Sequence, residues 1–142
     1  MNAERANYQD TDLILKLYEL RREETMRKAR SYVGGKFSPK SAEEMVAIVK
    51  AGAPESGYML QVYGYWDMVA AFVLEGPLSE RLVYQTCQEM YFQYAKIQPY
   101  LAGFRRLMNL PEWMRGIERL VEGSPEGRER LAQMRANLDQ LK

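Results

Sequence analysis

The sequence predicts an all-α protein, a single-domain bundle of five or six helices with a buried, aromatic-rich pair of helices at its centre. Helix-starting residues and glycine stops recur regularly along the chain, and no alternating apolar run of six residues indicates a strand. In addition, eleven of the sixteen aromatic residues lie between residues 51 and 110, where only nine of the thirty-nine charged residues fall. This middle segment is therefore expected to form the core.

The length of 142 residues fits one domain, 1–142, and a domain of this size buries roughly 68% of the surface that its unfolded chain exposes. Such a core needs no disulfide or structural metal. Residues 1–9 are expected to form a loose N-terminal segment ahead of the first helix.

The first predicted helix begins at a cap, Asp10 or Thr11, and continues to about Val33, where Gly34 and Gly35 stop it. Its apolar residues recur at helical spacing: Leu15, Tyr18, Met26, Ala29 and Val33. A capping box predicts the second helix, because Ser41 can accept an amide of the first turn and Glu44 can reach back. Gly52 and Pro54 end it.

The third predicted helix is capped by Ser56, continues to about Leu74 and closes at Gly76 and Pro77. Apolar residues lie nearly all round it, which is typical of a central helix rather than a surface one. Ser79 opens a fourth helix.

The fourth helix should kink or break near Pro99, because proline removes a backbone donor and clashes with the preceding turn. A further helix is expected to start at residues 109–112 and to end at Gly123. Ser124 then caps the last helix, with Pro125 at its first position. The last helix has only a thin apolar stripe and needs a partner to stay folded.

Composition excludes several chemistries. The chain has no histidine and one cysteine, so histidine-based triads, zinc sites and carboxylate–histidine metal sites are absent. Cys87 is interpreted as a small buried hydrophobe, although a reactive thiol is the alternative. We therefore predict no metal and no cofactor, and the balance lies against an enzyme.

Charge and hydropathy give no sign of nucleic-acid or membrane binding. The formal net charge is +1 and no segment carries a one-sign field, so binding to nucleic acid is not indicated. No stretch approaches the ~20 apolar residues that span a bilayer. The N-terminus has no export signal, and a cytoplasmic location is the expectation.

Asp67 is the one acid surrounded by apolar residues, directly after Tyr65 and Trp66. A carboxylate cannot be buried without a partner, and Gly64 and Ala71 make its helix face small enough for another backbone to approach. The partner could be an arginine, a tyrosine hydroxyl or a helix N-terminus.

Arg22 is the predicted partner of Asp67, because it interrupts the apolar stripe of the first helix; Arg21, Arg105 and Arg106 are competitors. The pair would hold two helices in register. A solvated position for Asp67, and a ligand-binding or catalytic role for it, remain open.

The other candidates are Glu89 and the tyrosines. Glu89 shares a polar helix face and is interpreted as a solvated surface residue. Tyr58, Tyr65 and Phe72 align on one helix face, and Tyr84 and Tyr91 on another. They predict an aromatic core, with an exposed partner-binding surface or a ligand cavity as alternatives.

Two segments resemble a known bacterial family. They are Tyr58 to Glu80, which includes Tyr65-Trp66-Asp67, and Phe104-Arg105-Arg106 with the following Asn109-Leu110-Pro111-Glu112. Together they cover about the central third of the chain and resemble a helical domain of unknown function. In some members this domain follows a membrane anchor, of which this sequence shows no sign. The resemblance implies an all-α fold and carries over no activity or site residue.

Three functions are compatible with these observations. The first is a non-enzymatic helical protein that acts by association with itself or with another protein, because the chain has more aromatic and methionine residues than a small bundle needs. The second is a bundle that binds a small molecule, with Asp67 and an arginine fixing a polar group beside Tyr65 and Trp66. The third is a histidine-free enzyme that uses Asp67 or Glu89.

Overall fold

The computed structural model describes residues 5–141, and this part of the chain is helical, without a strand. The predicted all-α class is therefore confirmed, but the count of five or six helices is wrong. The helices are α1 (Tyr8–Arg22), α2 (Glu24–Gly35), α3 (Ala42–Lys50), α4 (Pro54–Leu74), α5 (Glu80–Thr86), α6 (Gln88–Ile97), the 3-10 turn η1 (Gln98–Tyr100), α7 (Leu101–Met108), α8 (Arg115–Glu122) and α9 (Pro125–Gln140).

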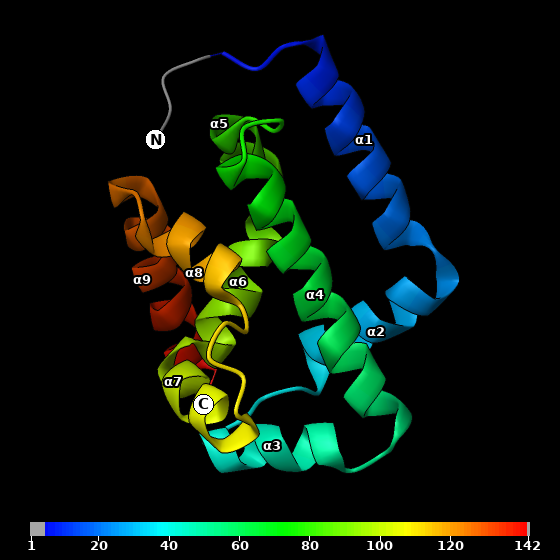
Figure 1. The fold of residues 1–142 in the computed structure, drawn as a ribbon, viewed down its shortest axis with the longest axis vertical. Helices are drawn as coiled ribbons and strands as arrows, with labels where there is room; N and C mark the ends of the chain where they lie inside the picture. The colour runs from blue at the N-terminus through cyan, green and yellow to red at the C-terminus, as the bar shows by residue number, and fades with distance from the viewer. Residues whose placement is uncertain (1–4, 142) are drawn as a thin grey trace.

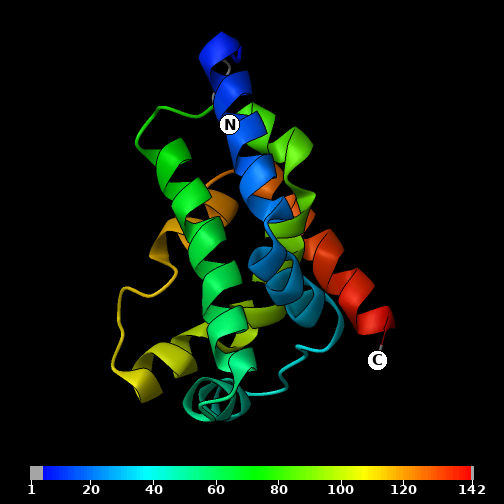
Figure 2. The ribbon, with the colours of Figure 1, turned by 90° about the vertical axis from the view of Figure 1, so that its right-hand side faces the viewer.

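The longest helix, α4, organises the bundle. It packs against α2, α3 and α8, while α9 packs against α6 and α8, and α3 against α7. In Figure 1, α4 crosses the front of the molecule between α1 and α8, and α3 lies across its lower end. The side view in Figure 2 places α4 at one side of the bundle and α9 at the other. The central helix of the sequence analysis is thus covered on most sides, but not on all.

The core is rich in aromatic side chains from α4 and α6, as predicted. Tyr63 and Trp66 of α4 are fully buried, and so is Tyr94 of α6. The Tyr63 hydroxyl donates to the backbone oxygen of Gln93 at 2.9 Å, which joins the two helices. Cys87 is also buried in the core, in agreement with its interpretation as a hydrophobe. Complete burial raises the pKa of Tyr63 well above its usual value.

The first predicted helix is divided at Glu23, which has extended backbone angles (φ −60°, ψ 145°). The Glu23 carboxylate accepts the amides of Thr25 and Met26, both at 3.0 Å, and these bonds lower its pKa. Glu23 therefore caps α2. Glycine and proline, the usual markers of a helix break, are absent at this point, so no local residue pattern indicates the break.

The start of α1 also differs from the prediction. The cap is Asn7, whose side chain accepts the Asp10 amide while Asp10 accepts the Asn7 amide in return. Asp10 is thus the third helical residue and not the cap. The loose segment predicted for residues 1–9 ends earlier, because α1 begins at Tyr8; residues 1–4 lie outside the described residues.

The fourth predicted helix is interrupted at Cys87, whose angles (φ −121°, ψ 53°) separate α5 from α6. The break predicted near Pro99 is confirmed as the turn η1. The helix expected from residue 109 begins only at Arg115, because Asn109 and Met114 both adopt left-handed angles, with φ of 54° and 62°.

Three of the four serine caps are confirmed. The hydroxyls of Ser41, Ser79 and Ser124 each accept a first-turn amide of the helix that follows. Glu44 reaches the Lys40 amide rather than that of Ser41. Ser56 is not a cap; its hydroxyl donates to the Ile48 carbonyl, and α4 begins at Pro54 without a side-chain cap.

The last helix finds the partner that its thin apolar stripe requires. Leu131 is buried, and Arg135 donates to the Ala95 carbonyl of α6 at 2.6 Å. Arg130 lies 3.5 Å from the ring centroid of Tyr84 and donates to the Tyr84 carbonyl. In the described part of the chain, none of the helices is both long enough and apolar enough to cross a membrane.

Replacing Gly127 by alanine should destabilise the protein, although alanine favours helix by about 1 kcal/mol over glycine. A Cβ atom at Gly127 would lie 2.1 Å from the Val121 carbonyl oxygen, which is backbone and cannot move cheaply. We expect a loss of about 1–3 kcal/mol in the free energy of unfolding, measured by urea denaturation. Gly34→Ala in α2 is the matched control, because nothing lies within 4 Å of the added Cβ atom and its stability should not fall. Equal stability of the two variants would contradict the packing described here.

Candidate functional site

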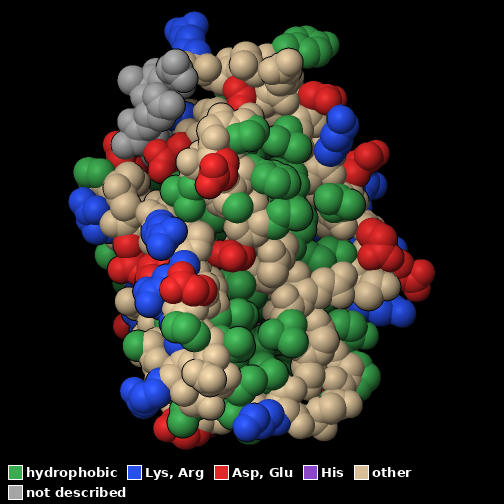
Figure 3. All heavy atoms as spheres, in the orientation of Figure 1, with side chains coloured by type: hydrophobic (Ala, Val, Ile, Leu, Met, Phe, Trp, Pro, Cys, Tyr) green, Lys and Arg blue, Asp and Glu red, His purple; other side chains and the backbone are tan. Residues whose placement is uncertain are grey.

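One face of α4 is open to solvent although this helix is apolar all round. The exposed residues Gly57, Leu60, Gln61, Gly64 and Ala71 share this side of the helix, with the half-buried Met68 between them and the exposed Leu74 at its end. We call this set the α4 face. Figure 3 views the molecule from this side and shows hydrophobic side chains along its middle, with charged side chains mainly toward the edges.

The shape of the α4 face would allow another polypeptide backbone to approach it closely. Leu60 is 42% exposed and Leu74 46% exposed. At Gly57 and Gly64 an added Cβ would meet nothing within 4 Å, so the backbone itself forms part of the surface there. Helices that are apolar all round are normally buried. The face is therefore the feature of the described chain that most clearly lacks a partner.

Asp67 lies at the edge of the α4 face and is bound to α8. Its Oδ1 accepts the Ile117 amide at 2.9 Å. Ile117 is the third residue of α8, the position that an N-cap side chain normally binds, and Met114 at the cap supplies no such bond. Asp67 thus caps α8 from a neighbouring helix.

Gly116 makes this contact possible. A Cβ atom there would lie 2.9 Å from Asp67 Oδ1 and 3.5 Å from the Asp67 carbonyl oxygen. The approach predicted along Gly64 and Ala71 is not formed, because both residues are exposed and nothing lies within 4 Å of a Cβ atom at Gly64; the small residue that allows α8 to approach is Gly116 of α8 itself. Of the partners considered for Asp67, the structure contains the helix N-terminus.

The predicted contact between Asp67 and Arg22 is not formed, since no ion pair joins them in the described residues. The Arg22 guanidinium instead lies 5.8 Å from the ring centroid of Tyr18. Arg21 is the buried arginine of α1. It follows Leu17 by one turn and faces inward, whereas Arg22 is rotated by about 100° away from it.

Tyr65 and Trp66 meet Arg21 rather than Asp67. The Tyr65 hydroxyl donates to the Leu17 carbonyl at 2.6 Å and accepts from Arg21 Nη1 at 3.1 Å. The Arg21 guanidinium lies 5.1 Å from the Trp66 ring centroid and 5.9 Å from that of Tyr65. Burial raises the pKa of Tyr65, and Arg21 opposes the rise. The four predicted site residues thus take part in separate contacts: Asp67 joins α4 to α8, Tyr65 and Trp66 contact Arg21 of α1, and Arg22 contacts Tyr18 within α1.

Glu89 is not simply solvated. Its carboxylate pairs with Arg30 Nε at 3.1 Å, and both side chains are about two-thirds buried or more, at 26% and 32% exposure. Arg30 also donates to the Arg21 carbonyl at the end of α1. The pair therefore joins α2 to α6 and fixes the end of α1.

The apolar stripe of the first predicted helix is buried in α2 but exposed in α1. Met26, Ala29 and Val33 in α2 are buried, whereas Leu15 and Tyr18 in α1 are 60% and 51% exposed. The break at Glu23 allows the two helices to turn different faces inward. The exposed residues of α1 add apolar surface to the molecule.

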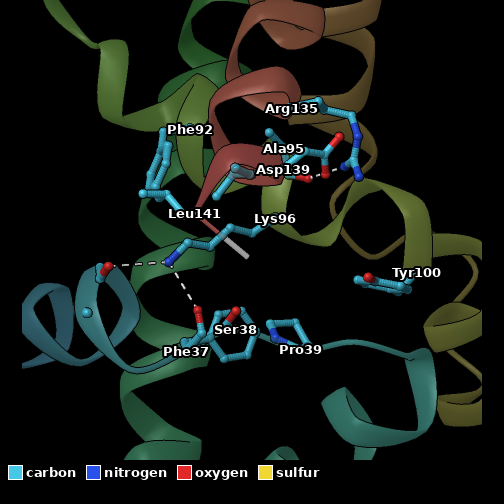
Figure 4. A pocket seen from close by; sticks show the side chains of 13 residues that line it. Phe37, Ser38, Pro39, Phe92, Ala95, Lys96, Tyr100, Arg135, Asp139 and Leu141 are labelled. Carbon is cyan, nitrogen blue, oxygen red and sulfur yellow. Dashed lines mark hydrogen bonds between the residues drawn. The ribbon is translucent and has the colours of Figure 1, made fainter.

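A pocket of about 250 Å³ lies between the end of α2, α6 and the last turn of α9. Figure 4 shows Lys96 in it, with one dashed bond to a carbonyl oxygen at the end of α2 and another to Phe37, just beyond that end. Its Nζ donates to the carbonyls of Val33, Gly34 and Phe37, the last at 3.1 Å. Burial lowers the Lys96 pKa to about 8. All three ammonium donors have acceptors, so Lys96 acts as a cap for α2.

Among the described residues, acids and cysteine form no group of three that could hold a metal ion. The sequence analysis did not single out Leu60, Met68 or Lys96. The one sign of the α4 face in the sequence is that apolar residues lie nearly all round this helix. That pattern predicts a central, buried helix and does not show that one side stays exposed.

Comparison with family models identifies the chain. Residues 8–124 match the model described as Domain of unknown function (DUF4760). The chain belongs to this family. The DUF4760 match extends from α1 to the cap of α9, a longer stretch than the central third that carried the resemblance, and it contains the whole α4 face. No curated protein and no solved structure matches the chain.

Removing the Asp67 carboxylate should destabilise this DUF4760 domain. Asp67→Ala leaves the Ile117 amide without its acceptor, and we expect a loss of about 1 kcal/mol in the free energy of unfolding, as for N-cap residues. Asp67→Asn keeps an acceptor and should lose less. Asp12→Ala is the control, because its pair with Lys16 is exposed and should contribute less than about 0.5 kcal/mol. An Asp67→Ala variant as stable as the wild type would rule out the capping role.

Stability should depend on pH through Lys96. Its pKa is about 8 in the folded protein against 10.5 for a free lysine, so between these values the unfolded chain holds a proton that the native one has lost. The free energy of unfolding should then rise as pH increases from about 8 to 10.5. We expect this rise in the wild type relative to Lys96→Met, measured by urea denaturation at each pH. The same comparison with Lys28→Met, an exposed lysine, should show no such trend, and a flat Lys96→Met difference would contradict the prediction.

Proposed function

We propose that this protein is a non-enzymatic helical protein that acts by self-association, with the α4 face of one copy packed against the α4 face of a second. The observation that carries the proposal is the exposure of one side of a helix that is apolar all round. Burying that side against another copy removes apolar surface from water, which is the main favourable term in association. From the sequence alone we further propose a bacterial, cytoplasmic setting.

The pattern of small and large residues on the α4 face favours a second copy over an unrelated partner. Five residues of the face, Gly57, Leu60, Gly64, Met68 and Ala71, are spaced symmetrically about Gly64; the polar Gln61 would lie opposite Asp67. In an antiparallel pair with a two-fold axis at Gly64, Gly57 would lie opposite Ala71 and Leu60 opposite Met68. Each large side chain would then have a partner, and the two backbones could approach at Gly64. An interface of this kind uses the same patch on both subunits.

The charges around the α4 face are compatible with this pairing. Between Glu55 and Glu75, the ends of the face, α4 carries a single charged residue, Asp67. Because Asp67 accepts the Ile117 amide at a helix N-terminus, its charge is partly compensated within its own subunit. Two copies of the face can therefore meet without opposing like charges at the centre.

The interface is expected to be weak. The segment from Gly57 to Ala71 is about 21 Å long. A single helix face of this length covers less than the roughly 800 Å² per partner of a standard stable interface. We therefore expect a dimer that dissociates on dilution rather than an obligate one.

Small-molecule binding beside Asp67 receives less support. The carboxylate is already bound to α8, and the arginine near Tyr65 and Trp66 packs against their rings. The pocket beside Lys96 does not include Asp67 in its lining. Self-association requires no rearrangement of these contacts.

Leu60→Glu should abolish the dimer and leave the monomer folded. Leu60 is exposed, so its replacement should change the free energy of unfolding by no more than about 0.5 kcal/mol. In the dimer it would place two unpaired carboxylates in an apolar interface. Sedimentation equilibrium over a range of concentrations should show a monomer–dimer equilibrium for the wild type and a monomer for the variant.

Two further variants test whether dimerisation depends on the α4 face itself or on any added surface charge. Leu107→Glu is the matched control, since Leu107 of α7 is 44% exposed, close to the 42% of Leu60, and lies outside the face. It should dimerise like the wild type. Gly64→Leu has free space around its Cβ in the monomer but would block the close approach of two copies. A strictly monomeric wild type, or a Leu60→Glu variant that still dimerises, would contradict the proposal.

A further inference from the structure

A second pocket, of about 490 Å³, lies between the end of α7 and the start of α8. Its lining is basic and includes three arginines with one glutamate: Ala102, Arg105, Arg106, Asn109, Pro111, Arg115 and Glu118. The sequence motifs around Phe104 and Asn109 supply most of this lining, and neither the core nor the α4 face accounts for the three arginines. We call it the arginine pocket.

Glu118 neutralises only part of this charge. It accepts Arg115 Nη1 at 2.8 Å and Arg105 Nη1 at 3.2 Å, so one carboxylate serves two guanidinium groups. Burial raises the Glu118 pKa, but the hydrogen bonds from Arg115 and Arg105 outweigh it and lower the pKa overall. The carboxylate is therefore charged at neutral pH, and the arginine pocket retains two positive charges.

Two arginines of the pocket, Arg105 and Arg106, have hydrogen-bond donors left for a ligand. The Arg105 side chain is only 8% exposed; its Nε donates to the Trp113 carbonyl at 2.7 Å. Its Nη2, in contrast, is buried and has no hydrogen-bond partner among the described residues. A buried donor without an acceptor costs about 1–3 kcal/mol. Arg106 is exposed at the same pocket and forms no ion pair within the described part of the chain.

We propose that the arginine pocket binds the phosphate group of a small phosphorylated molecule. A phosphate monoester carries a charge of about −1.5 to −2 at neutral pH, which matches the two uncompensated guanidinium charges better than a carboxylate does. Its oxygens are acceptors that suit the planar donors of arginine. The volume of about 490 Å³ leaves room for more than the phosphate itself and falls within the range of small-molecule pockets.

The protein holds the donors in place before the ligand arrives. Arg105 is fixed by Trp113 and Glu118, and Arg115 Nε donates to the Pro111 carbonyl at 3.1 Å. Because two of the three arginines are already held by the protein, binding a ligand costs less side-chain entropy than it would with three unrestrained arginines.

Titration of the ¹⁵N-labelled protein with inorganic phosphate at constant ionic strength tests the proposal. We expect saturable amide shifts confined to residues of the arginine pocket. Arg106→Gln should weaken binding about tenfold, as for loss of one charge-assisted hydrogen bond. Arg119→Gln should bind like the wild type, because Arg119 is an exposed arginine of α8 that is not part of the lining. Arg105 is left unchanged because its buried side chain holds the loop before α8.

Three outcomes would overturn the proposal: shifts spread evenly over surface arginines, equal weakening in the Arg106→Gln and Arg119→Gln variants, or acetate binding as tightly as phosphate at the same site. Thermal unfolding of each variant verifies that it is folded. The monomeric Leu60→Glu variant should bind phosphate as the wild type does, because the arginine pocket and the α4 face are independent features. The two proposals can therefore fail separately.

Discussion

The need to cover α4 determines the arrangement of the other helices. This helix is apolar on nearly every side, so most of its surface must be removed from water, and α2, α3 and α8 pack against it. Four of its polar side chains each reach a different neighbouring helix. Ser56 bonds to the end of α3, Tyr63 to α6, Tyr65 to α1 and Asp67 to the start of α8.

These four hydrogen bonds specify the register between α4 and its neighbours, which apolar burial alone does not. Apolar burial is proportional to area and does not specify register, whereas a buried hydroxyl or carboxylate must meet its partner within hydrogen-bond distance. Because each bond joins α4 to the backbone of another helix, it fixes the position of that helix along α4. The same arrangement leaves one side of α4 open, since no helix of the described chain crosses it. The α4 face is thus a consequence of how the other sides are covered.

Basic side chains perform a second task, the completion of helix ends. Lys96 binds the last carbonyls of α2, Arg30 the end of α1, and Arg135 the end of α6. Each places a positive charge at a helix C-terminus, where the helix dipole favours it. The arginine pocket is the exception, because one carboxylate there serves two guanidinium groups and the third arginine, Arg106, forms no ion pair with any residue that the structure describes.

The sequence by itself determined the features that depend on neighbours in the chain: the all-α class, the caps at Ser41, Ser79 and Ser124, and the break at Pro99. A capping hydroxyl or a missing amide acts within a few residues, so its effect can be read locally. Tertiary structure decided the break at Glu23, the choice of Arg21 over Arg22 and the partner of Asp67. These depend on which side of a helix faces the core, and one residue changes that direction by about 100°. The exposure of the α4 face was also decided by tertiary structure. Because α4 is apolar on nearly every side, its residues cannot indicate which side the fold leaves uncovered.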